Sequence, residues 1–269
     1  MATDLSVCFA GDKLYGDDFS IEEIKKWFDD EKEGYAKLVA EDHSAYRYSY
    51  HALNLHHGFR HIQRTKKGNV LGLGSAFGDE FKPILDQIDS LTILDPSETF
   101  SRSKDINGVP CRYVKPALNG DLPFDNNAFQ LITSLGTLHH IPNVSHVLNE
   151  CHRCLAPQGR MLVREPIISL GDWTKPRVGL TKRERGIPLE LFREMISTAG
   201  FHVEHEALCG FPIIPKITNK LGIAAYNSRS LVLLDSLVCT IFRWNKRYHR
   251  TSLMQKFGPT SVYFVLRKE

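Results

Sequence analysis

The sequence has no long apolar run and no strong excess of charge. No uncharged stretch is long enough to span a bilayer, and residues 1–4 begin acidic, unlike a secretion signal. The net charge of +3 is too small to indicate nucleic-acid binding, and no run of basic and aromatic residues supplies a concentrated patch. These absences predict a cytoplasmic protein without a membrane span or a nucleic-acid partner.

The sequence lacks a complete cysteine motif for binding a metal. The six cysteines are scattered, which indicates reduced thiols in a chain without a secretion signal. Cys151 and Cys154 have the spacing of half a zinc site, but no second CxxC or HxxxH follows at a suitable distance. The same segment shows a helix cap at Asn143 and one apolar face, formed by Val144, Val147, Leu148, Cys151 and Leu155. We therefore predict a packing role and no metal.

The segment 69–81 (NVLGLGSAFGDEF) carries the strongest signal in the chain. An apolar run ends in a cluster of glycines, and a second apolar run, 91–95, ends in Asp95. A strand, a glycine turn, a helix and a strand with a terminal acid form half of a nucleotide-binding crevice. The pattern predicts an adenosine-type cofactor whose ribose is held by Asp95.

Strand and helix patterns alternate through the middle of the chain. Strands are predicted at 69–73, 91–95, 111–114, 129–135, 160–165, 201–204 and 261–266, with helices at 79–87, after Asn143 and at 188–200. This alternation predicts an α/β fold with a mostly parallel seven-stranded sheet and helices on both faces.

Two further segments flank this core, which is predicted at 65–207 and 259–269. Residues 1–64 are predicted to form a helical cap, with a capping box at Ser20 and Glu23 and a second helix over 45–63. Residues 208–258 are too long for a hairpin loop and predict an inserted helical lid. The apolar helix near 230–238 ends in basic residues. It suits a membrane surface, although a lid, a core element or a homodimer contact is the more common role.

Five passages, taken in order, resemble the class I S-adenosylmethionine-dependent methyltransferases, in particular the small-molecule group that includes the ubiquinone-biosynthesis type. They are 70–78, Asp95, 120–129 (GDLPFDNNAF), 138–142 (LHHIP) and 155–160 (LAPQGR). The resemblance implies a Rossmann-like methyltransferase fold and S-adenosyl-L-methionine as cofactor. The residues that it places around the cofactor are Gly72, Leu73, Gly74, Ser75, Ala76, Phe77, Gly78, Asp95, Pro96, Ser97, Asn119, Gly120, Ser134, Leu135 and Gly136.

The sequence departs from that family at several positions. The family usually has an acid where Gly72 stands, which helps to hold the methionine end, and glycine where Ala76 stands. An acid near the adenine is also common in the passage that residues 115–119 occupy, and none is present there.

Methyl transfer to oxygen needs a group that removes a proton from the acceptor. His139 and His140 follow a predicted strand at the edge where open α/β sheets bind ligands, and Glu165 ends the next strand. We consider these three residues as catalytic candidates. The predicted activity is O-methylation of a small molecule or a glycan-type acceptor.

Two alternatives follow from the same residues. The altered positions Gly72 and Ala76 are compatible with a binding protein on a degenerate methyltransferase fold. A nicotinamide-dependent oxidoreductase is disfavoured, because the glycines at 72, 74 and 78 do not form GxGxxG.

Overall fold

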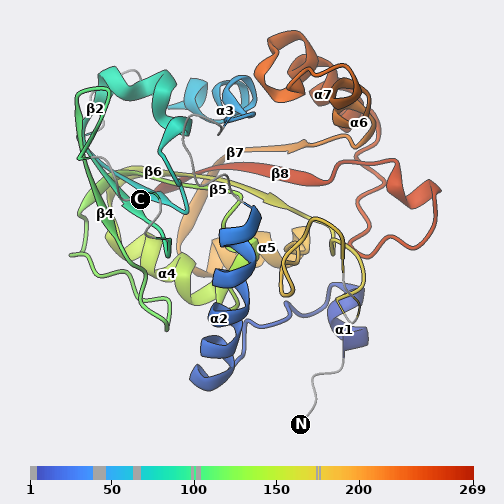
Figure 1. Ribbon diagram of the computed structural model, residues 1–269, viewed down its shortest axis with the longest axis horizontal. Helices are drawn as coiled ribbons and strands as arrows, with labels where there is room; N and C mark the ends of the chain where they lie inside the picture. The colour runs from blue at the N-terminus through green and yellow to red at the C-terminus, as the bar shows by residue number, and fades with distance from the viewer. Residues whose placement is uncertain are drawn as a thin grey trace.

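The computed structural model describes residues 5–38, 47–62, 68–97, 100, 104–173, 175 and 177–269 (Figure 1). The helices are α1 (Leu5–Ala10), α2 (Ile21–Leu38), α3 (His51–His57), α4 (Val144–Cys154), α5 (Leu189–Thr198), α6 (Ile213–Lys220) and α7 (Arg229–Ile241). The strands are β1 (Gly68–Leu73), β2 (Ile88–Leu94), β3 (Asp105–Ile106), β4 (Val109–Val114), β5 (Phe129–Leu135), β6 (Leu155–Pro166), β7 (Phe201–Cys209) and β8 (Ser261–Lys268). None of the helices in these ranges is long and apolar enough to cross a membrane.

The strands form one sheet in the order β3-β4-β2-β1-β5-β6-β8-β7. The pairings from β4 to β6 are parallel, whereas β8 runs antiparallel to both β6 and β7. The predicted α/β class and mostly parallel sheet are confirmed. The predicted count of seven strands misses β3, a two-residue strand that pairs antiparallel with β4.

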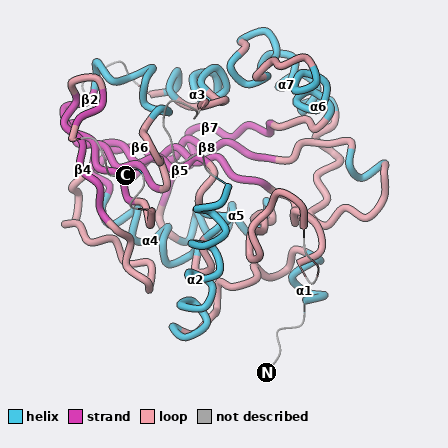
Figure 2. Tube along the Cα trace, in the orientation of Figure 1, coloured by secondary structure: helices cyan, strands magenta, loops and turns pink. Residues whose placement is uncertain are grey.

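Helices cover both faces of the sheet, which Figure 2 shows as a layer of strands between helical layers. Successive residues of β1 point to opposite faces, so Leu71 packs in one core with Phe192 of α5, and Val70 packs in the other with Leu53 of α3 and Val232 of α7. Because both faces of the sheet are buried, the central strands appear in the sequence as continuous apolar runs.

The N-terminal part contains the predicted helix start. The Ser20 amide donates to the Glu23 carboxylate, and the Glu23 amide donates to the Ser20 hydroxyl, so the predicted capping box is confirmed. The helix predicted over 45–63 is much shorter, since α3 spans only His51–His57 and a 3₁₀ turn follows at Phe59–His61. Its two predicted ends, at 45–46 and 63, lie outside the described residues.

Two elements of the core differ from the prediction in kind or length. The segment Asp79–Gln87 is a 3₁₀ helix and not an α-helix, and Pro83, which lacks an amide hydrogen, lies inside it. Strand β7 continues to Cys209, five residues beyond its predicted end at 204, because its pairing with β8 continues to Cys209↔Ser261.

Candidate functional site

The glycine turn after β1 is held in an unusual backbone conformation. Gly74, Ala76 and Gly78 all have positive φ, at +61°, +47° and +72°. Glycine adopts this region without strain, whereas Ala76 is a buried alanine in it. The Gly74 amide donates to the Leu94 carbonyl at 2.9 Å, which brings the turn against the end of β2. This is the conformational reason why glycine is expected at position 76.

Asp95 lies directly after β2, beside this turn, and is buried. Its Oδ1 accepts a hydrogen bond from the Ser97 amide at 2.9 Å. Its Oδ2 has no hydrogen-bond partner among the described residues. Burial raises the pKa of Asp95 to about 6, against the opposing effect of backbone hydrogen bonds. A buried carboxylate oxygen without a partner needs a donor, and ribose hydroxyl groups would supply one.

A pocket at this edge of the sheet brings part of the predicted site together. Seven predicted residues line it: Leu73, Gly74, Asp95, Pro96, Gly120, Gly136 and His140. The opposite side is formed by Ile24, Trp27, Phe28 and Glu31 of α2. The other predicted residues do not line the pocket: Gly72, Ser75, Ala76, Phe77, Gly78, Ser97, Asn119, Ser134, Leu135, His139 and Glu165.

Gly72 stands where a larger residue does not fit. A Cβ on Gly72 would come within 2.3 Å of the Ser75 hydroxyl oxygen. That hydroxyl donates to Glu80, which also accepts a hydrogen bond from Thr133 at 2.6 Å. Glu80 is buried, and burial raises its pKa. A buried carboxyl group thus lies beneath the turn, although position 72 itself carries none.

The turn after β5 is fixed by Glu165 at the end of β6. Its Oε1 accepts from the amides of Thr137 and Leu138 at 2.9 and 2.8 Å, and its Oε2 contacts Nδ1 of His139 at 2.7 Å. Thr137 donates its hydroxyl to the Leu73 carbonyl at 2.8 Å. Its side chain occupies the space above Gly74, where an added Cβ would meet it at 2.5 Å. Glu165 therefore positions the turn instead of facing the pocket.

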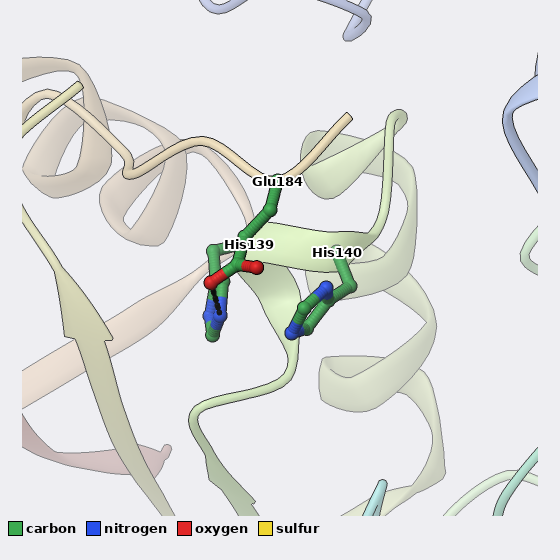
Figure 3. A group of neighbouring side chains, drawn as sticks. All are labelled: His139, His140 and Glu184. Atoms are coloured by element: carbon green, nitrogen blue, oxygen red, sulfur yellow. Dashed lines mark ion pairs between the residues drawn. The ribbon is translucent and has the colours of Figure 1, made fainter. Parts of the chain in front are cut away.

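His139 lies between two carboxylates. Its Nδ1 contacts Glu165, and its Nε2 contacts Glu184 at 3.4 Å, the pair marked in Figure 3. Burial alone would lower the pKa of His139, but the two carboxylates outweigh it and raise the pKa to about 9. The pKa of Glu184 falls to about 2, because contact with His139 outweighs burial. The arrangement is that of a buried imidazolium with both ring nitrogens engaged.

His140 has the opposite character and lines the pocket. Its Nδ1 lies 2.9 Å from Oε2 of Glu31, a buried residue of α2. Burial and the neighbouring charge of His139 lower the pKa of His140, against the effect of Glu31 and Glu184. The ring is therefore held neutral at pH 7 and is oriented by a carboxylate.

His139, His140 and Glu184 are also close enough to hold a metal ion, with one ligand atom of each within 4.8 Å of the others (Figure 3). A ligating histidine must lose its proton. Glu165 and Glu184 both favour the protonated form of His139, and their contacts already engage both ring nitrogens of that residue. The geometry therefore suits a proton-bearing triad better than a metal centre.

Cys151 and Cys154 are buried in the apolar core on α4, as the packing interpretation predicts.

Known proteins resemble the part of the chain that carries this geometry. Residues 71–163 match the family model of a methyltransferase domain. The mitochondrial 2-methoxy-6-polyprenyl-1,4-benzoquinol methylase of Pongo abelii is 31% identical over 113 residues, and that of Homo sapiens is 30% identical over 113 residues. The matched part of the chain is therefore similar to the class I S-adenosylmethionine-dependent methyltransferases. Each match covers 33% of this chain and 35% of the relative, so the chain spans about a third of the length of these methylases.

Solved structures extend the likeness of the methyltransferase fold beyond the matched residues. An S-adenosylmethionine-dependent methyltransferase of Mesorhizobium loti has a TM-score of 0.52 at 16% identity, and covers 78% of this chain and 94% of that chain. The YcgJ protein of Bacillus subtilis has a TM-score of 0.52 at 15% identity, and covers 81% and 98%. The likeness shows the fold.

The names of the curated relatives place those proteins in mitochondria, so the cytoplasmic location of this chain stays a prediction.

Several residues at the methyltransferase site escaped the sequence prediction. Glu31, Glu184 and Thr181 surround the two histidines, and Asp121 lines the pocket near Gly120. Asp121 lies two positions after the passage 115–119, in which an acid is expected near the adenine, so a slightly wider window includes it. Glu31 and Glu184 lie 109 and 45 positions from the histidines that they contact, and no local spacing signals such contacts.

Proposed function

We propose that this chain transfers a methyl group from S-adenosyl-L-methionine to a hydroxyl group of a small, mainly apolar acceptor. The single observation that carries the proposal is one pocket that contains both Asp95, with its unpartnered carboxylate oxygen, and the neutral His140 paired with Glu31. The first group suits an adenosine-type cofactor, and the second suits removal of a proton from an acceptor.

The residues present fit the cofactor best at its ribose. Asp95 would accept hydrogen bonds from the ribose hydroxyls, because its Oδ2 has no other partner among the described residues. Gly74, Gly120 and Gly136 line the same pocket and add no side chains to it. Asp121, whose carboxylate accepts a hydrogen bond from Asn119, also lines the pocket and would accept one from the adenine amino group. When bound, the cofactor supplies an activated methyl group, so the protein has little covalent chemistry to perform.

His140 is the group that we assign as general base. A neutral imidazole accepts a proton, and Glu31 orients the ring and would stabilise the imidazolium that forms. Glu31 is itself fixed by the Thr181 hydroxyl at 2.5 Å and the Arg183 amide at 2.8 Å. His139 is less suited to this role, because it is protonated below about pH 9 and does not line the pocket.

His139 and Glu165 act instead as positioning residues. Glu165 binds two amides of the turn, and the charge of His139 lowers the pKa of its neighbour His140. The pair thereby keeps the base unprotonated at neutral pH.

The lining of the pocket favours an aromatic or lipid-like acceptor over a sugar. Ile24, Phe28, Leu118 and Ile141 contribute apolar side chains to the lining. Pockets that recognise a ligand through a few polar groups in an apolar wall are typical of small organic ligands. A phenol or a quinol meets these conditions, and quinol also occurs in the name of the curated relatives.

A methyl-transfer screen over phenols, quinols, sugars and carboxylates tests the proposal, with products identified by mass. On the acceptor so found, we expect His140→Gln to lower kcat by about two to four orders of magnitude while the affinity for S-adenosylhomocysteine stays the same. His202→Gln, which alters an exposed histidine of β7 that does not line the pocket, is the matched control. Wild-type kcat should rise with pH through a value below 6.5 and then level off. Near-normal turnover of His140→Gln would remove this residue from catalysis.

A binding protein without activity is the second candidate function. Thr137 fills the space above Gly74, and Ala76 replaces the usual glycine, so the glycine turn has fewer open positions than the family's turn usually offers a cofactor. A chain that binds S-adenosylhomocysteine but methylates nothing in the screen would favour this candidate.

A further inference from the structure

The outward face of α7 carries an exposed apolar stripe. Leu233, Leu237 and Ile241 of α7 follow at helical spacing and are 49%, 59% and 57% exposed, and Trp244 in the turn after the helix is 70% exposed. The inward face is fixed by Asp235, a fully buried acid that accepts hydrogen bonds from the amides of Gly210 and Phe211. The helix therefore cannot turn its apolar stripe inward without breaking these two bonds.

Exposed apolar side chains concentrate on the surrounding segment 208–258. Ten of the sixteen exposed large apolar side chains in the described ranges lie between 217 and 254. Besides the stripe, they include Ile217, Leu221, Ile223, Leu234, Leu253 and Met254. Such a concentration on one part of a soluble domain marks an interaction surface.

The exposed charged side chains of this segment are all basic. It contains eight lysine and arginine residues and one acid, the buried Asp235, whereas the rest of the chain has 26 basic and 30 acidic side chains. Seven of the eight cations are exposed: Lys216, Lys220, Arg229, Arg243, Lys246, Arg247 and Lys256. The small net charge of the chain thus conceals a strongly basic apolar surface.

This surface does not close over the cofactor pocket. No described residue of 208–258 lines that pocket. Figure 1 shows α6 and α7 on one side of the sheet and α2 and α4 on the other. A role as a lid would therefore explain neither the exposed apolar stripe nor the exposed lysine and arginine side chains of this segment.

We propose that the basic apolar face formed by α6, α7 and the loop 242–256 docks on an anionic lipid bilayer. Exposed leucine, isoleucine and tryptophan side chains insert at the boundary between headgroups and acyl chains, and lysine and arginine side chains contact the lipid phosphates. Charge complementarity selects this partner, because a second copy of the face would place cations against cations. An isolated helix on a bilayer needs a polar face toward water. Helix α7 needs none, because the face opposite its apolar stripe is buried against the rest of the protein.

Co-sedimentation of the full chain with vesicles tests the docking surface. One set of vesicles contains phosphatidylcholine alone, and the other contains phosphatidylcholine with phosphatidylglycerol. We expect binding to the anionic vesicles, with affinity that falls as salt is added. Leu237→Glu and Trp244→Glu should each weaken it by roughly tenfold or more, since a charged group replaces an inserted apolar side chain. Val178→Glu, at a fully exposed position outside the face, is the matched control.

The cations are tested separately. The double variant Arg243→Gln, Arg247→Gln should bind anionic vesicles roughly tenfold or more weakly, whereas Lys25→Gln, Lys26→Gln on α2 should bind as the wild type does. Circular dichroism confirms that each variant is folded. The proposal is overturned if the wild type ignores anionic vesicles or if Leu237→Glu binds them normally. It is also overturned if sedimentation equilibrium shows a dimer that Leu237→Glu converts to a monomer, because the face is then a contact between copies.

Discussion

At the residue scale, the chemistry of the site depends on which buried groups carry a proton. His139 and His140 are adjacent in the chain, yet one is held charged between Glu165 and Glu184 and the other is held neutral beside Glu31. Their different partners, and not their residue type, decide which of them can accept a proton.

The first prediction at this scale concerns Asp95 and pH. The Asp95 carboxylate accepts hydrogen bonds best when it is ionised, and its pKa is about 6. The affinity for S-adenosylhomocysteine should therefore be nearly constant above pH 7 and fall by about tenfold between pH 7 and pH 5. Calorimetry across this range checks it. In Asp95→Asn the affinity should be weaker by about 1.5–3 kcal/mol at pH 7.5 and independent of pH in this window. A pH dependence that survives in Asp95→Asn would belong to another group.

The second prediction concerns the strained alanine in the glycine turn. Ala76→Gly relieves a positive φ that costs alanine about 1–2 kcal/mol, which offsets the lost methyl group and the greater freedom of the unfolded chain. We expect the free energy of unfolding to change by less than about 0.5 kcal/mol. Ala76→Val should cost roughly 2 kcal/mol or more, since a β-branched side chain is disfavoured at positive φ. Denaturant unfolding measures both, and equal costs for the two variants would contradict the argument.

At the scale of elements, the site is assembled from segments far apart in the chain. Trp27 of α2 donates its indole hydrogen to the His140 carbonyl at 2.7 Å. Arg185, in the loop before α5, is fully buried and donates to the carbonyls of Tyr15, His139, Ile141 and Pro142. These contacts tie α2, the N-terminal loop and the turn after β5 into one unit around the base.

The third prediction tests this connection. Arg185→Met removes hydrogen bonds to four buried or partly buried carbonyls, and each bond to a charged group contributes about 1.5–3 kcal/mol. We expect the free energy of unfolding to fall by roughly 3 kcal/mol or more in denaturant titrations. Lys182→Met removes a cation only three positions away whose side chain is 69% exposed, and it should cost less than about 1 kcal/mol. Similar losses for both variants would show that the buried bonds of Arg185 are not special.

The sequence predicted the elements that depend on local pattern. The buried strands, the glycine turn, Asp95 at the end of β2 and the capping box at Ser20 all follow from short-range periodicity and turn chemistry. The pattern also predicts the helix at Asp79–Gln87 with its bounds, but not its 3₁₀ form, which Pro83 within it could have indicated. The partners of the histidines were missed because Glu31 and Glu184 reach them only through the folded chain.

At the scale of the whole molecule, the fold separates the two proposed functions in space. The proposed cofactor pocket lies at the carboxyl ends of the central strands and is lined on one side by α2, where open α/β sheets bind ligands. The proposed lipid-docking face lies on the other side of the sheet, on α6 and α7 (Figure 1). The two are therefore testable independently, since a substitution on α7 changes no residue of the pocket.

The central claim is that the pocket beside Asp95 binds S-adenosylmethionine. The most direct measurement is calorimetric titration of the wild-type chain with S-adenosylhomocysteine at pH 7.5, beside a titration with NAD. The account predicts saturable one-to-one binding of S-adenosylhomocysteine, weakened by roughly tenfold or more in Asp95→Asn, and no binding of NAD. A folded wild-type chain that does not bind S-adenosylhomocysteine, or that binds NAD equally well, would contradict it.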